Sequence, residues 1–252
     1  QNAFCDDILK IEKNNVRFKS TNWKRNTKKD EGGGEYRILQ NGSVFDKVGV
    51  NFSKVYGKFP KEFQKNIPGA HRDPKFWATG ISVVMHMKNP LIPAMHFNTR
   101  YICTTYDWFG GGMDVTPSKV DDAEKKEFHK ILKNMCNRHD KTFYTKYKKW
   151  CDEYFYLPHR KEAQGIGGIF FDYKKDNFEK DFKFIRDVGT TFQMIFNEII
   201  KSKMKKKWTL KDKEMQYIKR GRYTEFNLLY DRGTKFGLQT GGNVEGILMS
   251  LP

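Results

Sequence analysis

The sequence predicts an α+β fold with a mainly antiparallel β-sheet. Its strand-like runs follow one another as meanders joined by short turns, and its helix-like runs are grouped between them. Parallel sheets arise from strands and helices that alternate regularly, and this chain has no such alternation. No internal repeat or linker divides the sequence. We therefore expect a single domain over residues 1–252.

The beginning of the chain is predicted to hold a short helix and a hairpin. Residues 1–14 carry apolar side chains at helical spacing, and residues 20–34 are polar, end in three glycines and are predicted to be an exposed loop. An Asn-Gly pair then separates two runs in which β-branched or aromatic residues alternate with others. This is a strong hairpin signal. The strands expected there cover residues 36–40 and 44–57.

A second hairpin, which follows a predicted strand at residues 77–87, carries groups that strands rarely need. In its first run, His96 and Arg100 are four residues apart, so an alternating strand directs both to one face. In its second run, Asp114 follows three glycines, which leave room for a flat ligand against the backbone. An imidazole, a guanidinium and a carboxylate in one hairpin indicate a functional site rather than part of the hydrophobic core.

The second half of the chain is predicted to be mainly helical. Acidic residues after Pro117 are typical of a helix N-terminus. The short apolar run at residues 165–172 predicts a buried strand. The helices expected are at residues 117–137, 143–157, 180–204 and 210–220, and further strands are expected at residues 223–231 and 236–239.

The composition indicates a folded and strongly basic protein. Hydrophobic residues make up 38% and aromatic residues 15% of the chain, which is enough for a core. We expect no transmembrane helix and, with no leader visible, a cytoplasmic protein. The net charge of +17 favours anionic partners. The lysines are scattered along the chain, so we expect no nucleic-acid partner and keep a basic RNA- or anionic-lipid-binding module as the alternative function.

Cations also lie near the C-terminus, beside glycines at the ends of the expected strands. Arginine in such a place suits bidentate binding of carboxylates or phosphates, and a solvated basic rim is the alternative. The residues are Arg220, Arg222, Arg232 and Lys235, which together with Arg100 and Arg160 could form a pocket for a ligand with several carboxylates.

The histidines and glycines contain no familiar cofactor motif. None of the glycine-rich stretches fits a P-loop or a dinucleotide-binding pattern. The six histidines show no H-x-x-x-H or H-E-x-x-H spacing. A transition-metal site from dispersed histidines stays open, and a structural hydrogen bond is the ordinary role of any one of them.

Four long motifs give the chain a resemblance to a known enzyme family. They occupy residues 96–100, 108–117, 165–172 and 220–252, and the similarity runs in order from about residue 17 to the end. The chain resembles the oxygen-dependent coproporphyrinogen III oxidases.

The resemblance implies an activity, a fold and an assembly. Enzymes of this family use O₂ to decarboxylate two propionates of coproporphyrinogen III to vinyl groups, which gives protoporphyrinogen IX for haem biosynthesis with CO₂ and H₂O₂ as further products. The implied fold is a large, flat antiparallel sheet with helices on both faces, and the implied assembly is a homodimer. The family usually continues beyond the position of Pro252.

The resemblance also implies roles for individual residues. His96 matches the proposed proton donor, Asp114 the carboxylate that holds pyrrole N–H groups, and Arg100 a propionate anchor. The substrate-binding positions that match are Ser82, Asn98, Thr99, Arg100, Gly241, Gly242 and Asn243. This chain departs from the family at Asn243, where Arg is frequent, and at Thr99, where Tyr is common.

The cofactor expectation is that none is required, with O₂ as the co-substrate. The substrate supplies the electrons, so no redox cofactor is needed. For bacterial relatives a divalent metal has been proposed, and other members work without one. The matching metal positions are His86, His96, His129 and His159.

Overall fold

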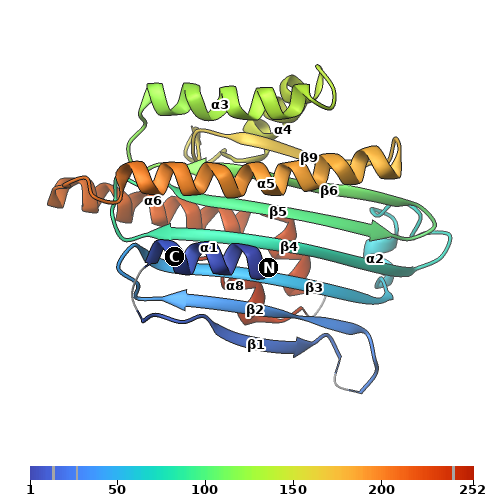
Figure 1. Cartoon of the computed structure of the whole chain (residues 1–252). Coiled ribbons are helices and arrows are strands. Elements are labelled where there is room, and N and C mark those ends of the chain that lie inside the picture. Colours follow the sequence, from blue (N-terminus) through green and yellow to red (C-terminus); the bar gives the residue numbers. More distant parts are fainter. Residues whose placement is uncertain (13–14, 27, 240–241) are drawn as a thin grey trace.

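A single antiparallel sheet forms the centre of the molecule (Figure 1). The structure is a computed structural model that describes residues 1–12, 15–26, 28–239 and 242–252. Within these residues seven strands pair in the order β1-β2-β3-β4-β5-β6-β9, and every neighbouring pair is antiparallel. The strands are β1 (Lys19–Lys24), β2 (Gly32–Gln40), β3 (Phe45–Lys58), β4 (Lys75–Met87), β5 (Ala94–Cys103), β6 (Asp107–Thr116) and β9 (Gly168–Lys174). The α+β prediction is confirmed.

Helices cover the sheet on both sides (Figure 1). One face, which we call the α5 face, lies under α1 (Asn2–Glu12) and α5 (Phe178–Lys203). The opposite face, the α6 face, lies against α6 (Leu210–Leu229), α7 (Arg232–Gln239) and α8 (Val244–Leu248). The remaining elements are α2 (Lys61–Gln64), α3 (Asp122–Asn137), α4 (Phe143–Tyr154) and a small hairpin of β7 (Tyr156–Leu157) and β8 (Glu162–Ala163).

The main hydrophobic core lies between the sheet and α5. Alternation along β5 places Met95 and Phe97 in this core, where the Phe97 ring stacks on Phe192 of α5 at a centroid distance of 5.2 Å. His96 and Asn98, which alternate with them along β5, therefore face α6. The core thus fixes the register that presents polar side chains on the other face.

Helix ends are set by local capping. Asp121 accepts hydrogen bonds from the backbone N–H groups of Ala123 and Glu124, so α3 begins at Asp122 rather than at Pro117 as predicted. Thr209 and Asp212 form a capping box at the start of α6.

The prediction of an exposed loop over residues 20–34 was wrong. β1 pairs with β2 from Lys19↔Ile38 to Lys24↔Gly33, and β2 already begins at Gly32. β1 is an edge strand whose side chains are exposed or half-buried. It consequently lacks the apolar alternation on which strand prediction depends.

The two strands predicted over residues 223–231 and 236–239 were also wrong, because these residues belong to α6 and α7. Tyr223, Phe226 and Asn227 are buried at i, i+3 and i+4, which is helical spacing. This stretch was predicted as a strand because it is rich in aromatic and leucine residues, although its buried positions follow helical spacing. Among the described residues, no helix is both long and apolar enough to cross a membrane.

Candidate active site

His96 and Asp114 form the centre of the polar α6 face. The two residues lie directly opposite each other on β5 and β6, and His96 Nδ1 is 2.7 Å from Asp114 Oδ1. Asp114 is only 4% exposed. A carboxylate that deep in a protein requires strong partners. The Asp114 oxygen Oδ2 forms no hydrogen bond to any described residue and is not fully buried, so it can accept a ligand N–H.

The pairing with Asp114 controls the protonation of His96. Burial alone would lower the pKa of His96, but the hydrogen bond and negative charge of Asp114 outweigh it and raise this pKa above its ordinary value. Asn98 Nδ2 lies 3.1 Å from His96 Nε2. This network assigns the proton of neutral His96 to Nδ1 and leaves Nε2 as the acceptor.

Arg100 lies on the same strand and the same face, held by a second carboxylate. Its Nη2 donates to Asp172 Oδ2 at 2.7 Å, and its Nη1 lies 3.4 Å from Asn98 Oδ1. The Arg100 side chain is 31% exposed. A guanidinium has five N–H donors, so Arg100 keeps donors for a carboxylate ligand.

Glycine is required opposite Arg100. Gly110 on β6 pairs with Arg100, and a Cβ at Gly110 would lie 2.5 Å from Asp172 Oδ1 and 2.9 Å from Arg100 Cζ. Gly80 pairs with Arg100 from the other side, on β4, and Gly112 pairs with Asn98. These three glycines therefore leave a surface without side chains around the polar residues, which we call the glycine floor.

Aromatic side chains from α4 and its C-cap, from β9 and from α6 lie beside this surface. The Phe155 ring lies 6.2 Å from the His96 ring and 5.1 Å from that of Phe226. Tyr154 stacks on Phe170 at 4.4 Å and donates a hydrogen bond to Asp231 at 2.7 Å. Basic, acidic and aromatic groups thus meet over one patch of the sheet.

Comparison with known proteins decides the family. A sequence model of the coproporphyrinogen III oxidase family matches residues 1–252. The chain is 54% identical over 261 residues to the oxygen-dependent coproporphyrinogen-III oxidase of Rickettsia rickettsii (strain Sheila Smith), covering 100% of this chain and 92% of that protein. The protein of that name from Rickettsia akari (strain Hartford) gives the same values. The one from Rickettsia bellii (strain OSU 85-389) is 53% identical over 257 residues, or 98% of this chain and 91% of the relative.

The chain belongs to the coproporphyrinogen III oxidase family. The resemblance seen in the sequence is thereby confirmed. The comparisons give no support to the alternative of a basic RNA- or lipid-binding module.

The structure separates the substrate-binding positions that the family resemblance implied. Ser82 is opposite Asn98 on the α6 face. Thr99 is opposite Ile81, which packs on the main core, so the Thr99 side chain points to the α5 face. Asn243 caps α8 by accepting from Gly246 N at 2.8 Å, and Gly242 N donates to Gly237 O at 2.8 Å. Gly241 lies outside the described residues.

The histidines of the alternative metal site do not form a ligand cluster. Within the described ranges, no three or more His, Cys, Asp or Glu side chains are placed to hold a metal. His86 Nε2 donates to the Ser250 carbonyl and His129 Nε2 to the Ile166 carbonyl, each at 2.8 Å. His159 lies between Glu225 and Tyr230. The residues present do not fit a metal centre built from these four positions, and the expectation that no metal is required stays a prediction.

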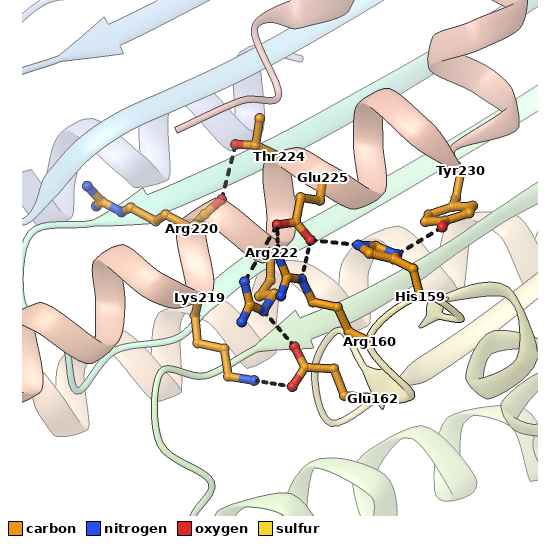
Figure 2. A network of polar contacts seen from close by, with 9 residues as sticks. All are labelled: His159, Arg160, Glu162, Lys219, Arg220, Arg222, Thr224, Glu225 and Tyr230. Atoms are coloured by element: carbon orange, nitrogen blue, oxygen red, sulfur yellow. Dashed lines mark hydrogen bonds and ion pairs between the residues drawn. The ribbon is translucent and has the colours of Figure 1, made fainter.

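Most of the predicted cation pocket is engaged in ion pairs with protein carboxylates. Figure 2 shows Arg160 and Arg222 converging on Glu225, with Arg222 also on Glu162, while Arg220 points away from them. Arg220 pairs instead with Asp46 at 2.7 Å. These arginines lie on helix α6 and a loop rather than at strand ends, because the strands predicted there are helical.

The two remaining predicted cations make no ion pair with Glu162, Glu225 or Asp46. Lys235 donates to the Leu229 carbonyl at 3.3 Å. The Arg232 guanidinium lies 5.8 Å from the Tyr154 ring, whose stacking partner Phe170 lies 6.0 Å from the Arg100 guanidinium. Of the predicted cations, Arg232 therefore shares an aromatic wall with Arg100.

The sequence reasoning missed the role of Asp172 as the partner of Arg100. The available signal was a charged residue directly after the fully apolar run of the buried strand β9. A cavity of about 20 Å³ lies beside His86, and a hollow of about 680 Å³ is lined by residues of β1, β2, β3 and the loop that joins β1 to β2. Neither is lined by His96, Asp114 or Arg100, so the site is defined by its side chains and by the glycine floor.

Proposed function

We propose that this protein decarboxylates two propionates of coproporphyrinogen III to vinyl groups with O₂, giving protoporphyrinogen IX, CO₂ and H₂O₂ in haem biosynthesis. Its family membership supports this activity. The observation that carries the residue assignment is the buried Asp114, which fixes His96 through Oδ1 and keeps Oδ2 for a pyrrole N–H. An ionised carboxylate is the side chain best suited to accept several N–H groups at once.

The glycine floor suits a large ring. Gly80, Gly110 and Gly112 border Arg100 and Asn98 on the α6 face, so a macrocycle can approach the backbone closely there. The substrate carries four carboxylates, which the net charge of +17 attracts from a distance. Arg100 holds a propionate of the reacting pyrrole through donors that Asp172 does not use.

The chain's own residues handle protons. Asp114 orients the pyrrole by accepting its N–H, and His96 Nε2 takes up a proton that is later returned. Loss of the pyrrole proton makes the ring electron-rich and able to reduce O₂. In each decarboxylation one C–H bond and the C–C bond to the carboxylate break. The two electrons and the hydrogen pass to O₂, which gains one further proton and leaves as H₂O₂, while CO₂ departs and a vinyl group remains.

Aerobic incubation with coproporphyrinogen III tests this function. Analysis of the oxidised porphyrins should show a monovinyl tripropionate intermediate followed by the divinyl product. A control without O₂ should leave the substrate unchanged. Absence of both vinyl products, combined with salt-sensitive binding of a generic polyanion, would instead favour the binding module.

We also propose that the reaction requires no metal or organic cofactor, with O₂ as co-substrate. The hydrogen bonds of His86 and His129 to backbone carbonyls support this proposal. Protein treated with a chelator and checked for metal content should keep its turnover. Loss of turnover that is restored by one divalent metal would contradict the proposal.

The assembly that we propose is a cytoplasmic homodimer that pairs through the outer side of α6. Leu210, Tyr217 and Ile218 on this side are 79%, 57% and 51% exposed, an unusual amount of apolar surface for one helix. A second copy would bury them. Light scattering should give twice the chain mass for the wild type and the mass of one chain for Ile218→Lys. A monomeric wild type would refute the dimer.

Cell fractionation tests the proposed cytoplasmic location.

A further inference from the structure

The pairing of β6 with β9 contains a β-bulge at Gly110. This one residue of β6 lies opposite two residues of β9, Asp172 and Tyr173. On either side of the two, Phe171 is buried in the main core and the Lys174 ammonium pairs with a carboxylate of α5 at 2.8 Å. Regular alternation would return Tyr173 to the α5 face. The bulge therefore allows two consecutive side chains to lie on the opposite face.

Trp108 is the side chain that Tyr173 contacts there. The next residue of β6, Phe109, is buried in the main core on the α5 face, so Trp108 faces α6. The Tyr173 ring lies 5.6 Å from the Trp108 ring. Trp108 precedes Gly110 by two residues, and Gly110 is opposite Arg100. The two rings therefore lie next to Arg100, on the side away from His96.

Trp108 and Tyr173 each have a feature that packing alone does not explain. Tyr173 has a φ of 54°, a left-handed conformation that is unfavourable for a residue with a Cβ, yet it is 48% exposed. Strained residues of this kind gather at functional sites. The Trp108 atom Nε1 is buried and donates to no residue in the described part of the chain. An indole N–H is only a donor, so the partner that it lacks is an acceptor.

The proposed function supplies an acceptor nearby, the propionate at Arg100. A Cβ at Gly110 would lie 2.9 Å from Arg100 Cζ, so the guanidinium lies over this glycine. Two residues of a strand span about 7 Å, a distance that an indole side chain can bridge. A carboxylate has about four acceptor positions on its two oxygens. It can therefore accept from Arg100 and from Trp108 Nε1 at the same time.

We propose that Trp108 and Tyr173 form the end of the propionate-binding subsite at Arg100. Trp108 Nε1 donates to the carboxylate, and the Tyr173 ring packs against the methylene groups of the arm. By excluding water, the two rings strengthen the hydrogen bonds of the carboxylate and hold the arm in one position. The β-bulge keeps Tyr173 on this face. The inference rests on the proposed function and adds two residues to its binding site.

Trp108→Phe tests the indole donor, because it removes the N–H and keeps an aromatic ring. The kcat/KM for coproporphyrinogen III should fall about threefold or more, as expected for one neutral hydrogen bond. The comparison is an analogue with ethyl groups in place of the two reactive propionates, measured as a competitive inhibitor. Its inhibition constant should be the same for the variant and the wild type. An unchanged kcat/KM, or an equal loss of affinity for the analogue, would overturn the donor role.

Tyr173→Asn tests the ring, because asparagine enters the left-handed region readily and so removes the ring without backbone strain. The kcat/KM should fall about fivefold through loss of the aromatic contact, while the unfolding midpoint stays equal or rises. The matched control is Lys161→Asn, at an exposed residue with a φ of 53° between β7 and β8. It relaxes the backbone in the same way and should leave kcat/KM unchanged.

A Tyr173→Asn variant with an unchanged kcat/KM would overturn the proposal, and a lowered midpoint would then show that the ring only stabilises the sheet. Turnover by the wild type and its loss in an Asp114 variant would still support the proposed function. The failure of this inference and the failure of the proposed function can therefore be told apart.

Discussion

Gly110 and Gly221 show how differently one methyl group can act at two positions of this chain. At Gly110 an added Cβ meets Asp172 and Arg100, whereas at Gly221, within α6, nothing among the described residues lies within 4 Å of it. The first glycine leaves room for an ion pair of the site. The second is a helical residue that weakens the helix.

Gly110→Ala should therefore damage the site, and Gly221→Ala should stabilise the protein. We expect the first variant to displace the Arg100 guanidinium and to raise the KM about tenfold, through the loss of roughly one charged hydrogen bond. The second should raise the free energy of unfolding by about 0.5–1 kcal/mol with unchanged kinetics. Steady-state kinetics and denaturant unfolding measure both effects. Equal kinetics for the two variants would contradict the role given to Gly110.

The burial of His86 predicts that the folded protein loses stability in weak acid. It is 1% exposed, and burial lowers the pKa of His86 to about 4 from 6.5. The unfolded chain therefore binds this proton first as the pH falls. Stability is full above about pH 6.5, declines as the pH falls towards about 4, and loses up to about 3 kcal/mol from this group.

Urea unfolding between pH 7 and pH 4 tests this, with His86→Asn as the comparison. The asparagine side chain keeps a donor for the Ser250 carbonyl but does not titrate. The pH dependence of the wild type should be steeper than that of the variant across this window. Parallel curves would show that His86 is not the group responsible.

At the scale of elements, a network of charged groups ties the β7–β8 hairpin to α6 (Figure 2). Glu225 of α6 accepts two hydrogen bonds of 2.5 Å from Arg160 and one of 3.0 Å from His159, whose other ring nitrogen is 2.8 Å from Tyr230 Oη. The hydrogen bonds from Arg160 are the main cause that lowers the pKa of Glu225 to about 2. The hairpin follows α4 directly, so this network holds the aromatic wall of the site against α6.

Glu225→Gln should loosen this hairpin. The stabilisation from Glu225 is present above its unfolded pKa near 4.5 and is lost as the pH falls towards about 2. Hydrogen exchange of residues 156–163 should therefore be faster in the variant at neutral pH and should differ less from the wild type in acid. Glu153→Gln is the matched control, because Glu153 makes only a 3.9 Å exposed pair with Lys149. Unchanged hydrogen exchange of residues 156–163 in Glu225→Gln would show that Glu225 does not hold the β7–β8 hairpin against α6.

Elements with strong local signals were predictable from the sequence, and those set by distant contacts were not. The Asn41-Gly42 pair predicted the β2–β3 hairpin, and Asn41 adopts a φ of 59°, in the left-handed region that Asn enters more readily than most residues. The edge strand β1 was missed because solvent covers its side chains. The C-terminal half of α6 was missed because its aromatic content resembles that of a strand, although its burial period is helical.

At the scale of the whole molecule, the register between neighbouring strands of the sheet brings the side chains of the site together. The sequence placed His96, Arg100 and Asp114 in one hairpin, and the register His96↔Asp114 makes two of them direct partners. The other contacts of the site come from Asp172 and from the Tyr154–Asp231 pair, which lie much further along the chain. Their positions depend on how β9, α4 and α6 pack, and local patterns do not encode such packing.

The central claim is that the buried Asp114 carboxylate holds both His96 and the reacting pyrrole. The most direct measurement is the kcat of Asp114→Asn for coproporphyrinogen III, together with its circular dichroism and unfolding midpoint. Asn keeps the size of Asp but can neither accept several N–H groups nor raise the pKa of His96. We predict a fall in kcat of about 10²–10⁴-fold in a variant that remains folded. Turnover close to that of the wild type would contradict the account.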